Sequence, residues 1–374
     1  MERYDFLVIG AGMAGASAAY WLAERGRVVV LEQEDAAGYH STGRSAAMYM
    51  ETYGGPLTRG LTAAGRAFLA DPPAGFAEAP LLSPQQVLYI GRADQLQALD
   101  RLYDENRPRV PSLARLDAAE ALGQTVPLRE DYVAGGVLEP ESLEIDVAAL
   151  HQGYLRGLRA RGGRLLTEAG VSALARNGDL WHAETPVGAF AAPVVIDAAG
   201  AWCDAVAALA GVPPIGLQPK RRTAFIFDGP ADGGVDRWPM VHDIDDAFYL
   251  KPDAGRLLAS PADETPSDPC DAYPEELDIA VGADRIMQAM PLEIRHIRNK
   301  WAGLRSFVRD RQPVAGFDVA AEGFFWLAGQ GGAGIMTAPA LGAITAAIAA
   351  GDPLPEDAAT RGVTAAQLSP GRLL

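Results

Sequence analysis

Three glycines and one acidic residue near the N-terminus have a spacing that could hold phosphate and sugar groups. Gly10, Gly12 and Gly15 follow an apolar segment, and Glu32 ends the next apolar segment. Gly10 permits a tight turn, Gly12 lets the backbone approach a pyrophosphate, and Gly15 allows close packing of a helix against a strand. Glu32 is placed to accept hydrogen bonds from an adenosine ribose. We therefore expect a bound dinucleotide that contains ADP.

Two further segments bear on which dinucleotide this is. Residues 38–47 are mostly small and include one arginine, which suits a loop pressed against a flavin and its phosphates. Residues 329–334 form a second glycine-rich turn between an apolar segment and a helix, where backbone N–H groups and the helix dipole favour negative charge. Reduced flavin carries negative charge near N1 and the C2 carbonyl, whereas NAD enzymes need no second anion site. The sequence therefore favours FAD.

Apolar periodicity indicates a parallel sheet that would hold these turns. Residues 4–9 and 28–32 are predicted to be buried strands, and residues 16–25 are predicted to form the helix between them. Further buried strands are expected at 193–198 and 324–328, the second leading through the glycine turn into another helix. This is the opening of a Rossmann-like dinucleotide-binding domain.

The pattern changes between residues 214 and 265, where short apolar segments alternate with Pro, Asp and Gly turns. Strands at 222–227, 247–251 and 256–260 are typical of an antiparallel sheet. We predict an α/β protein, α+β overall, with a discontinuous FAD-binding domain and a substrate domain built on a mainly antiparallel sheet. The expected boundaries are 1–80, 140–213 and 305–374 for the FAD-binding domain, and 81–139 and 214–304 for the substrate-binding domain.

Composition excludes several classes of function. The chain of 374 residues has 32 Lys and Arg against 48 Asp and Glu, and its net charge of −16 argues against nucleic-acid binding. Its two cysteines build no disulfide framework, which favours a reducing, cytoplasmic location, and its five histidines lack metal-ligand spacing. Residues 323–351 carry no charge, but glycines and Pro339 interrupt them, so no transmembrane segment is expected. Peripheral contact with the inner face of a membrane stays open.

Six segments spread along the chain carry a family resemblance: DFLVIGAGMAG, GYHSTGRSAA, VVIDAAGAWCD, FYLKPDAG, WAGLRSF and FFWLAGQGGAGI. In these segments the chain resembles the D-amino-acid oxidase superfamily of FAD enzymes, and it is most similar to bacterial D-arginine dehydrogenase-like enzymes. The resemblance implies non-covalent FAD and two domains. It also implies hydride transfer from the substrate Cα to flavin N5, giving an imine that is hydrolysed to a 2-oxo acid.

The resemblance also implies catalytic residues. Arg222 and Arg305 match positions that clamp a substrate carboxylate, for which the planar guanidinium is well shaped. Tyr53 and Tyr249 match positions where hydroxyls lie near the substrate carboxylate or amine. If the amine arrives neutral, the protein needs only to orient it in a dry pocket, which agrees with a sequence that offers no evident acid–base pair.

Two departures from the D-arginine-type enzymes bear on specificity. Met48 stands where those enzymes have a histidine, and the run Gln-Gln-Val87 replaces the glutamate that receives a cationic side chain. A guanidinium buried there would be unpaired, at a cost of several kcal/mol. We therefore predict a preference for neutral, apolar side chains, in a pocket to which Met240 and Gly332 also contribute and at whose wall His242 is expected.

The motifs and the resemblance together give the residues expected to contact FAD. They are Gly10, Gly12, Ala14, Gly15, Glu32, Gln33, Ser41, Thr42, Arg44, Ser45, Ala46, Ala47, Val171, Gly200, Trp202, Gly303, Gly331, Gly332, Gly334 and Ile335.

Alternative functions stay open at the level of sequence. The leading one is a D-amino-acid dehydrogenase. The others are an oxidase of glycine, sarcosine or another secondary amine, a 2-hydroxy-acid dehydrogenase, and a flavoprotein without enzymatic activity. The expected partner is a small amino acid, and the electron acceptor is a quinone, an electron-transfer protein or O2.

Overall fold

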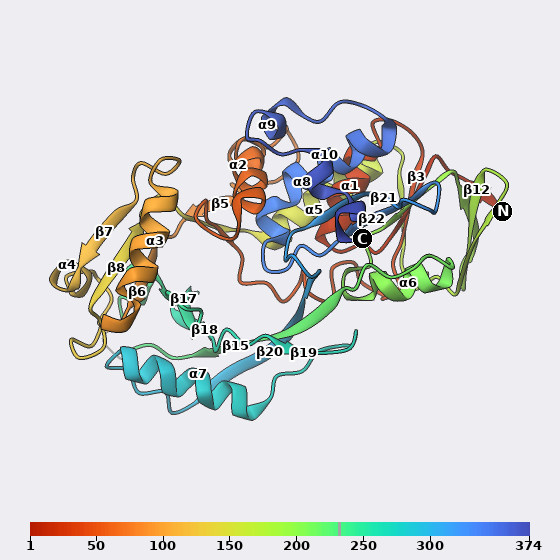
Figure 1. The fold of residues 1–374 in the computed structure, drawn as a ribbon. Coiled ribbons are helices and arrows are strands. Elements are labelled where there is room, and N and C mark those ends of the chain that lie inside the picture. Colours follow the sequence, from red (N-terminus) through yellow and green to blue (C-terminus); the bar gives the residue numbers. More distant parts are fainter. Residues whose placement is uncertain (231–232) are drawn as a thin grey trace.

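The computed structural model describes residues 1–230 and 233–374, and it arranges these residues in four sheets with helices around them (Figure 1). Two of the sheets position the candidate site. One is a six-stranded, mainly parallel sheet, and the other is a nine-stranded, mainly antiparallel sheet. The predicted α/β class, with a Rossmann-like part and an antiparallel part, is confirmed. The predicted domain boundaries stay a prediction.

The parallel sheet is built from short runs of apolar residues. Its order is β10 (Arg164–Leu166), β3 (Val28–Leu31), β2 (Phe6–Ile9), β14 (Val194–Asp197), β22 (Phe324–Ala328) and β21 (Val314–Phe317), of which β21 runs antiparallel at the edge. Side chains alternate between the two faces. Val8 packs with helices on one face, whereas Leu7 packs on the other face with a separate, four-stranded sheet that is described below. Both faces are thus covered, as a parallel sheet requires.

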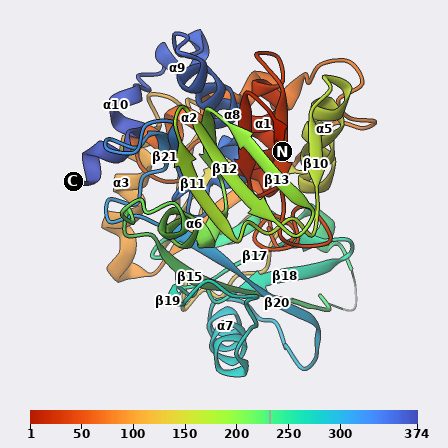
Figure 2. The ribbon, with the colours of Figure 1, turned by 90° about the vertical axis from the view of Figure 1, so that its right-hand side faces the viewer.

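Helices cover one face of this sheet (Figures 1 and 2). They are α1 (Met13–Leu22), α2 (Pro56–Ala70), α5 (Val147–Ala160) and α8 (Gly334–Ala350). The other face packs against α6 (Cys203–Leu209) and a four-stranded sheet of β1 (Glu2–Arg3), β13 (Gly188–Ala192), β12 (Leu180–Thr185) and β11 (Ala173–Asn177). The sequence did not indicate this small sheet. Within the described ranges, no helix is long and apolar enough to cross a membrane.

The antiparallel sheet forms the other lobe of the molecule (Figure 1). Its strands are β19 (Thr265–Pro266), β15 (Gln218–Phe227), β18 (Arg256–Ser260), β17 (Tyr249–Asp253), β16 (Met240–Asp243), β6 (Val87–Gly91), β8 (Gly135–Glu139) and β7 (Ala114–Asp117), with β20 (Ile297–Phe307) paired to β15. One face packs against α7 (Glu276–Ala289), in a core that contains Phe225 and Ile279. The opposite face carries a second apolar cluster that contains Leu99 and Met240, and it also carries residues that line a cavity.

A three-stranded sheet, made of β4 (Met48–Tyr49), β9 (Leu143–Ile145) and β5 (Leu82–Pro84), lies where the chain passes between the two larger sheets. Two further helices, α3 (Leu96–Asn106) and α4 (Ala118–Leu122), lie against β8 in the lobe of the antiparallel sheet.

Candidate active site

A cavity of about 490 Å³ is lined by residues from both large sheets. Gly10 and Glu32 come from the carboxyl ends of parallel strands, where α/β proteins bind their ligands. Arg222 and His242 come from the face of the antiparallel sheet that is opposite α7. The cavity therefore extends from the dinucleotide motif at one end to the predicted substrate residues at the other.

The first glycine turn is too close to its neighbours for side chains. Gly10 has a φ of +96°, and a Cβ there would lie 2.6 Å from the carbonyl oxygen of Ala198. A Cβ on Gly15 would lie 1.9 Å from the carbonyl oxygen of Gly10. Gly15 does not line the cavity, so its place agrees with the expected packing of helix on strand rather than with contact to a ligand.

Glu32 is held rigidly at the end of β3. Its Oε2 accepts a hydrogen bond from the Ala11 N–H at 2.8 Å, and its Oε1 accepts one from the Glu34 N–H at 3.0 Å. Only 7% of the residue is exposed. The nearby Thr42 hydroxyl accepts from the Met13 N–H at 2.9 Å, at the first residue of α1. The carboxylate and the helix terminus thus have fixed positions along the cavity.

The loop at 38–47 is tied to β20. The Ser41 hydroxyl donates to the Leu304 carbonyl at 2.6 Å. The Arg44 guanidinium donates to the carbonyls of Ala272 and Ala302, both at 2.9 Å, and pairs with Asp271. Arg44 therefore lines the cavity, but its charge is already engaged by the protein. The phosphate contact expected of this residue stays a prediction.

With the exception of Gly15, all the residues expected to contact FAD line the cavity. Besides those already described, this set comprises Gly12, Ala14, Gln33, Ser45, Ala46, Ala47, Val171, Gly200, Trp202, Gly303, Gly331, Gly332, Gly334 and Ile335.

Strand register explains why the two predicted arginines point the same way. In the antiparallel pair of β15 and β20, Arg222 lies opposite Gly303 and Arg305 lies opposite Lys220. Residues directly opposite each other share a face, as do residues two apart, so both arginines project from the same face of the sheet. Arg221 projects from the other face, where it pairs with Glu275 and Asp278 beside α7.

The two arginines differ in what surrounds them. Arg222 is 8% exposed, its Nε donates to the Asp263 carbonyl at 2.8 Å, and its Nη2 lies 3.7 Å from Oε1 of Glu264. For Arg305, the described residues provide no side-chain hydrogen bond or ion pair, although its guanidinium lines the cavity. Arg305 is half-buried, and a guanidinium partly removed from water without a protein partner favours the binding of an anion. Arg305 is therefore the stronger candidate for binding a carboxylate.

Two predicted tyrosines lie beside these arginines. A Cβ on Gly332 would lie 2.5 Å from the Tyr53 hydroxyl oxygen and 2.9 Å from Nη1 of Arg305, so the second glycine turn, Tyr53 and Arg305 meet at one place. Tyr249 is 6% exposed. Burial acts to raise the pKa of Tyr249, but the positive charges of Arg305 and Arg222 outweigh it, and the net pKa lies below its usual value.

Of the predicted pocket residues, Met48, Met240 and His242 line the cavity, as does Gly332. Val87 does not. It is fully buried opposite Glu139 and Met240, in the cluster that contains Met48. The prediction that Val87 forms part of the pocket wall is therefore not met, because other side chains of this cluster stand between it and the cavity.

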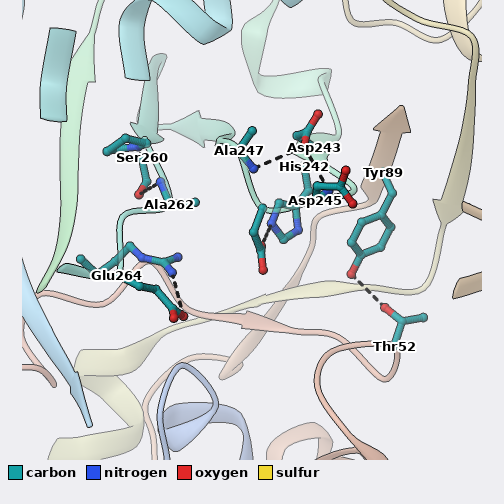
Figure 3. Close-up of polar contacts among 12 residues, drawn as sticks. Thr52, Tyr89, His242, Asp243, Asp245, Ala247, Ser260, Ala262 and Glu264 are labelled. Carbon is teal, nitrogen blue, oxygen red and sulfur yellow. Dashed lines mark hydrogen bonds and ion pairs between the residues drawn. The ribbon is translucent and has the colours of Figure 1, made fainter. Parts of the chain in front are cut away.

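The sequence did not single out Asp246, which also lines the cavity. It accepts a hydrogen bond from Nε2 of His242 at 2.6 Å, in the group of polar contacts around His242 that Figure 3 shows. A possible signal was the run of three aspartates that follows His242 within four residues. Met50, Ser306 and Gln330 line the cavity as well. Ser306 and Gln330 lie within the quoted segments WAGLRSF and FFWLAGQGGAGI, but they were not predicted as site residues, and no motif marked Met50.

These features fit a flavin dinucleotide. Both glycine turns have backbone that a side chain would block, since Gly331 has a φ of +54° and a Cβ there would lie 2.3 Å from the Phe307 ring. Glu32 stands at one end for a ribose and the arginine pair at the other. Bound FAD would supply an acceptor for a hydride, and residues from both glycine turns and from the loop at 38–47 would hold it.

A match to a family model shows which protein family the chain belongs to. The model described as FAD-dependent oxidoreductase, DAO, matches residues 5–348. The chain belongs to this family. It is therefore an FAD-dependent oxidoreductase of the D-amino-acid oxidase superfamily, and the predictions of an enzyme and of FAD as its cofactor are confirmed.

Curated relatives and solved structures agree with membership of the DAO family. The chain is 24% identical to the uncharacterized oxidoreductase YurR of Bacillus subtilis, covering 93% of this chain and 95% of YurR. It is 23% identical to the glycine oxidase of the same organism, covering 92% of each. The crystal structure of glycine oxidase from Geobacillus kaustophilus has a TM-score of 0.83 at 22% identity, covering 94% and 96% of the two chains. The structure of iminodiacetate oxidase from Chelativorans sp. BNC1 has a TM-score of 0.80 at 22% identity, covering 98% of each. At 22% identity, these two structural similarities show a shared fold.

Proposed function

We propose that the protein oxidises D-amino acids with neutral side chains to imines, which hydrolyse to 2-oxo acids. The observation that carries this proposal is the cavity-facing Arg305, which has no protein partner in the described residues and adjoins Tyr53 at the second glycine turn. A carboxylate is the anion whose two oxygens match a guanidinium. The family's relatives support an amine as the reacting group, because they include glycine oxidases and an iminodiacetate oxidase.

The residues at the end of the cavity that contains Arg305 and Arg222 each have a role in this proposal. Arg305 binds the substrate carboxylate, and Arg222 adds a second positive charge from the same face of the sheet. Tyr53 and Tyr249 lie beside the arginines and orient the substrate by their hydroxyls. Met48, Met50 and Met240 make this end apolar, which excludes water and strengthens the polar contacts.

The side-chain preference rests on the same apolar cluster. The cavity wall at this end includes Met48, Met50 and Met240, and the sequence position of the expected glutamate is taken by Val87, which does not line the cavity. Burial of an unpaired cation there would cost several kcal/mol. D-Met, D-Leu and D-Phe are therefore expected to have higher kcat/KM than D-Arg.

Anaerobic mixing tests the proposal directly. The purified yellow protein is mixed with matched D- and L-amino acids and with lactate-like hydroxy acids, and loss of flavin absorbance is followed. We expect D-Met, D-Leu and D-Phe to reduce the flavin and their L-enantiomers and the hydroxy acids to leave it oxidised. A clear preference for D-Arg would contradict the side-chain assignment, and reduction by hydroxy acids alone would contradict the reaction.

A second candidate is an oxidase of glycine, sarcosine or another secondary amine, which the similarity to glycine oxidases favours. Oxygen consumption with formation of peroxide during turnover would support it over a dehydrogenase that passes electrons to a quinone or an electron-transfer protein.

We also propose that the protein is located in the cytoplasm. This proposal rests on the two cysteines, which are free in the structure.

A further inference from the structure

The turn between β16 and β17 carries Asp246 to the cavity. Asp243 is fully buried, and its Oδ1 accepts from the N–H of Asp245 at 3.0 Å and of Ala247 at 3.3 Å (Figure 3). The Asp246 N–H donates to the Asp243 carbonyl at 3.0 Å, and Asp246 has a φ of +58°. Asp and Asn tolerate this left-handed conformation better than most residues. The turn thus has a defined shape that presents one carboxylate to the cavity.

His242 fixes that carboxylate. Its Nε2 lies 2.6 Å from Oδ1 of Asp246, and its side chain is 8% exposed, whereas the Asp246 side chain is 64% exposed. The imidazole packs against the rings of Tyr89 and Tyr249, with centroid distances of 5.3 and 5.8 Å. Nδ1 of His242 is buried without a partner in the described part of the chain, so the contact with Asp246 is the one that orients the ring.

The carboxylate has capacity for a ligand. In residues 1–230 and 233–374, Oδ1 of Asp246 accepts from His242, and no hydrogen bond to Oδ2 is found. Burial acts to raise the pKa of Asp246, but the hydrogen bond from His242 and the charges of Arg222 and Arg305 lower it overall. The carboxylate is therefore ionised and lies within electrostatic reach of both arginines.

We propose that Asp246 binds the α-ammonium group in which the substrate arrives, while Arg305 and Arg222 bind its carboxylate. The ammonium must then lose a proton, to the Asp246 carboxylate or to water, before hydride transfer, because the hydride leaves from a neutral amine. This inference rests on the proposed function and assigns a subsite within it. The two charged groups of an amino acid are attached to one carbon, so they can reach a cationic and an anionic partner only when these lie close together. At this end of the cavity the Tyr249 ring centroid lies 6.0 Å from Cζ of Arg222 and 5.8 Å from the ring centroid of His242, which holds Asp246. A side-chain cation has no such reason to meet Asp246 beside the arginines.

The test compares two ligands of the same shape on the holoenzyme. D-Leucine carries the ammonium, and 4-methylpentanoate lacks it. The Kd of D-leucine is read from the concentration dependence of anaerobic flavin reduction, or from its perturbation of flavin absorbance if no reduction occurs, and that of 4-methylpentanoate from the same perturbation. We expect Asp246→Asn to raise the Kd of D-leucine about tenfold, as for loss of a charged hydrogen bond, and not to raise that of 4-methylpentanoate.

Asp245→Asn is the matched control. Asp245 is the adjacent residue in the same turn, it accepts from the Gln95 amide at 2.8 Å, and it does not line the cavity. Its variant loses the same charge, so a general electrostatic effect would appear in both variants. His242→Gln, whose amide can still donate to Asp246, is expected to keep the tighter binding of D-leucine, and His242→Leu to lose part of it.

D-Lysine is measured in the same way as a third ligand. Three outcomes would overturn the inference: a wild-type protein that binds D-leucine no more tightly than 4-methylpentanoate, equal effects of the two asparagine variants, or a loss of affinity in Asp246→Asn that is confined to D-lysine. The last would assign Asp246 to a side-chain cation. If no amino acid reduces the flavin while the two ligands are still distinguished through Asp246, the proposed function fails and the subsite stands.

Discussion

The most informative single residue is Arg305, because within the described residues the fold gains no hydrogen bond or ion pair from its guanidinium. It occupies a strand that faces the cavity, beside Tyr53 and Gly332, and the described residues give its guanidinium no hydrogen bond or ion pair. The residue is half-buried, and a charge partly removed from water without a partner costs free energy. Such a cost is expected where a residue is kept for a ligand rather than for the fold.

Arg305→Met should therefore separate activity from stability. We expect kcat/KM for the best amino-acid substrate to fall 100-fold or more, about the cost of removing one partner of a buried charge pair. The free energy of unfolding of the apoprotein should change little, because this half-buried guanidinium makes no hydrogen bond or ion pair within the described residues. Urea unfolding and steady-state kinetics measure the two quantities.

Arg221→Met supplies the opposite control, since Arg221 projects from the other face of the neighbouring strand and pairs with Glu275 and Asp278. This variant should keep its activity and lose on the order of 2 kcal/mol of stability, because the Arg221 side chain is only 15% exposed and its loss leaves its carboxylate partners unpaired. A large loss of stability in Arg305→Met would argue that the residue serves the fold.

At the scale of elements, the segment that carries Tyr53 is held by a buried acid on β8. Glu139 accepts from the Glu51 N–H at 2.9 Å and from the Thr52 hydroxyl, which also bonds the Tyr89 hydroxyl at 3.0 Å. Burial is the main cause that raises the pKa of Glu139 from 4.5 to about 7. The position of Tyr53 thus depends on a neighbouring element whose charge changes near neutral pH.

This raised pKa predicts a specific dependence of stability on pH. Between pH 4.5 and about 7 the folded protein keeps a proton on Glu139 that the unfolded chain has released, so the free energy of unfolding falls as pH rises through this window. The loss is on the order of 3 kcal/mol at most. In Glu139→Gln the amide can accept from Glu51 and donate to Thr52, so this contribution disappears. The free energy of unfolding of Glu139→Gln minus that of wild type should therefore be larger at pH 8 than at pH 5.

Urea unfolding at the two pH values measures this difference. Glu141→Gln is the control, because the Glu141 side chain is 59% exposed and should show no such dependence. If the stability difference between wild type and Glu139→Gln is the same at pH 5 and pH 8, the assignment of a raised pKa to Glu139 is wrong.

How much the sequence could predict differs between elements. Apolar runs marked β2, β3, β14 and β22 because a parallel strand is buried on both faces. The pocket of the antiparallel sheet was harder, because it depends on which strands become neighbours. Val87 and Asp246 show this: the first is shielded by side chains that arrive from other elements, and the second is presented by a turn that Asp243 shapes. Neither effect leaves a periodic signal in the sequence.

At the scale of the whole molecule, the cavity joins elements that are far apart in the sequence. Its residues come from the first glycine turn, from both lobes, and from the turn that precedes α8 (Figure 1). A ligand that binds across this cavity stabilises the native arrangement of both large sheets, since the unfolded chain offers no such site. Loss of the cofactor should therefore lower the stability of the protein as a whole and not of one lobe alone.

Removal and restoration of FAD tests this dependence. Free FAD at 100 to 1,000 times its Kd should raise the Tm of the apoprotein by about 3–5 °C, given a chain of this size. Glu32→Gln weakens the acceptor that faces the ribose, and a tenfold higher Kd should reduce the rise by about 2 °C at the same FAD concentration. Glu24→Gln, which alters an exposed carboxylate near the end of α1 that pairs with Arg161, should leave the rise unchanged. An equal rise in Glu32→Gln would show that this carboxylate does not contact the cofactor, and separate melting transitions for the two lobes in the presence of FAD would show that the cofactor does not couple them.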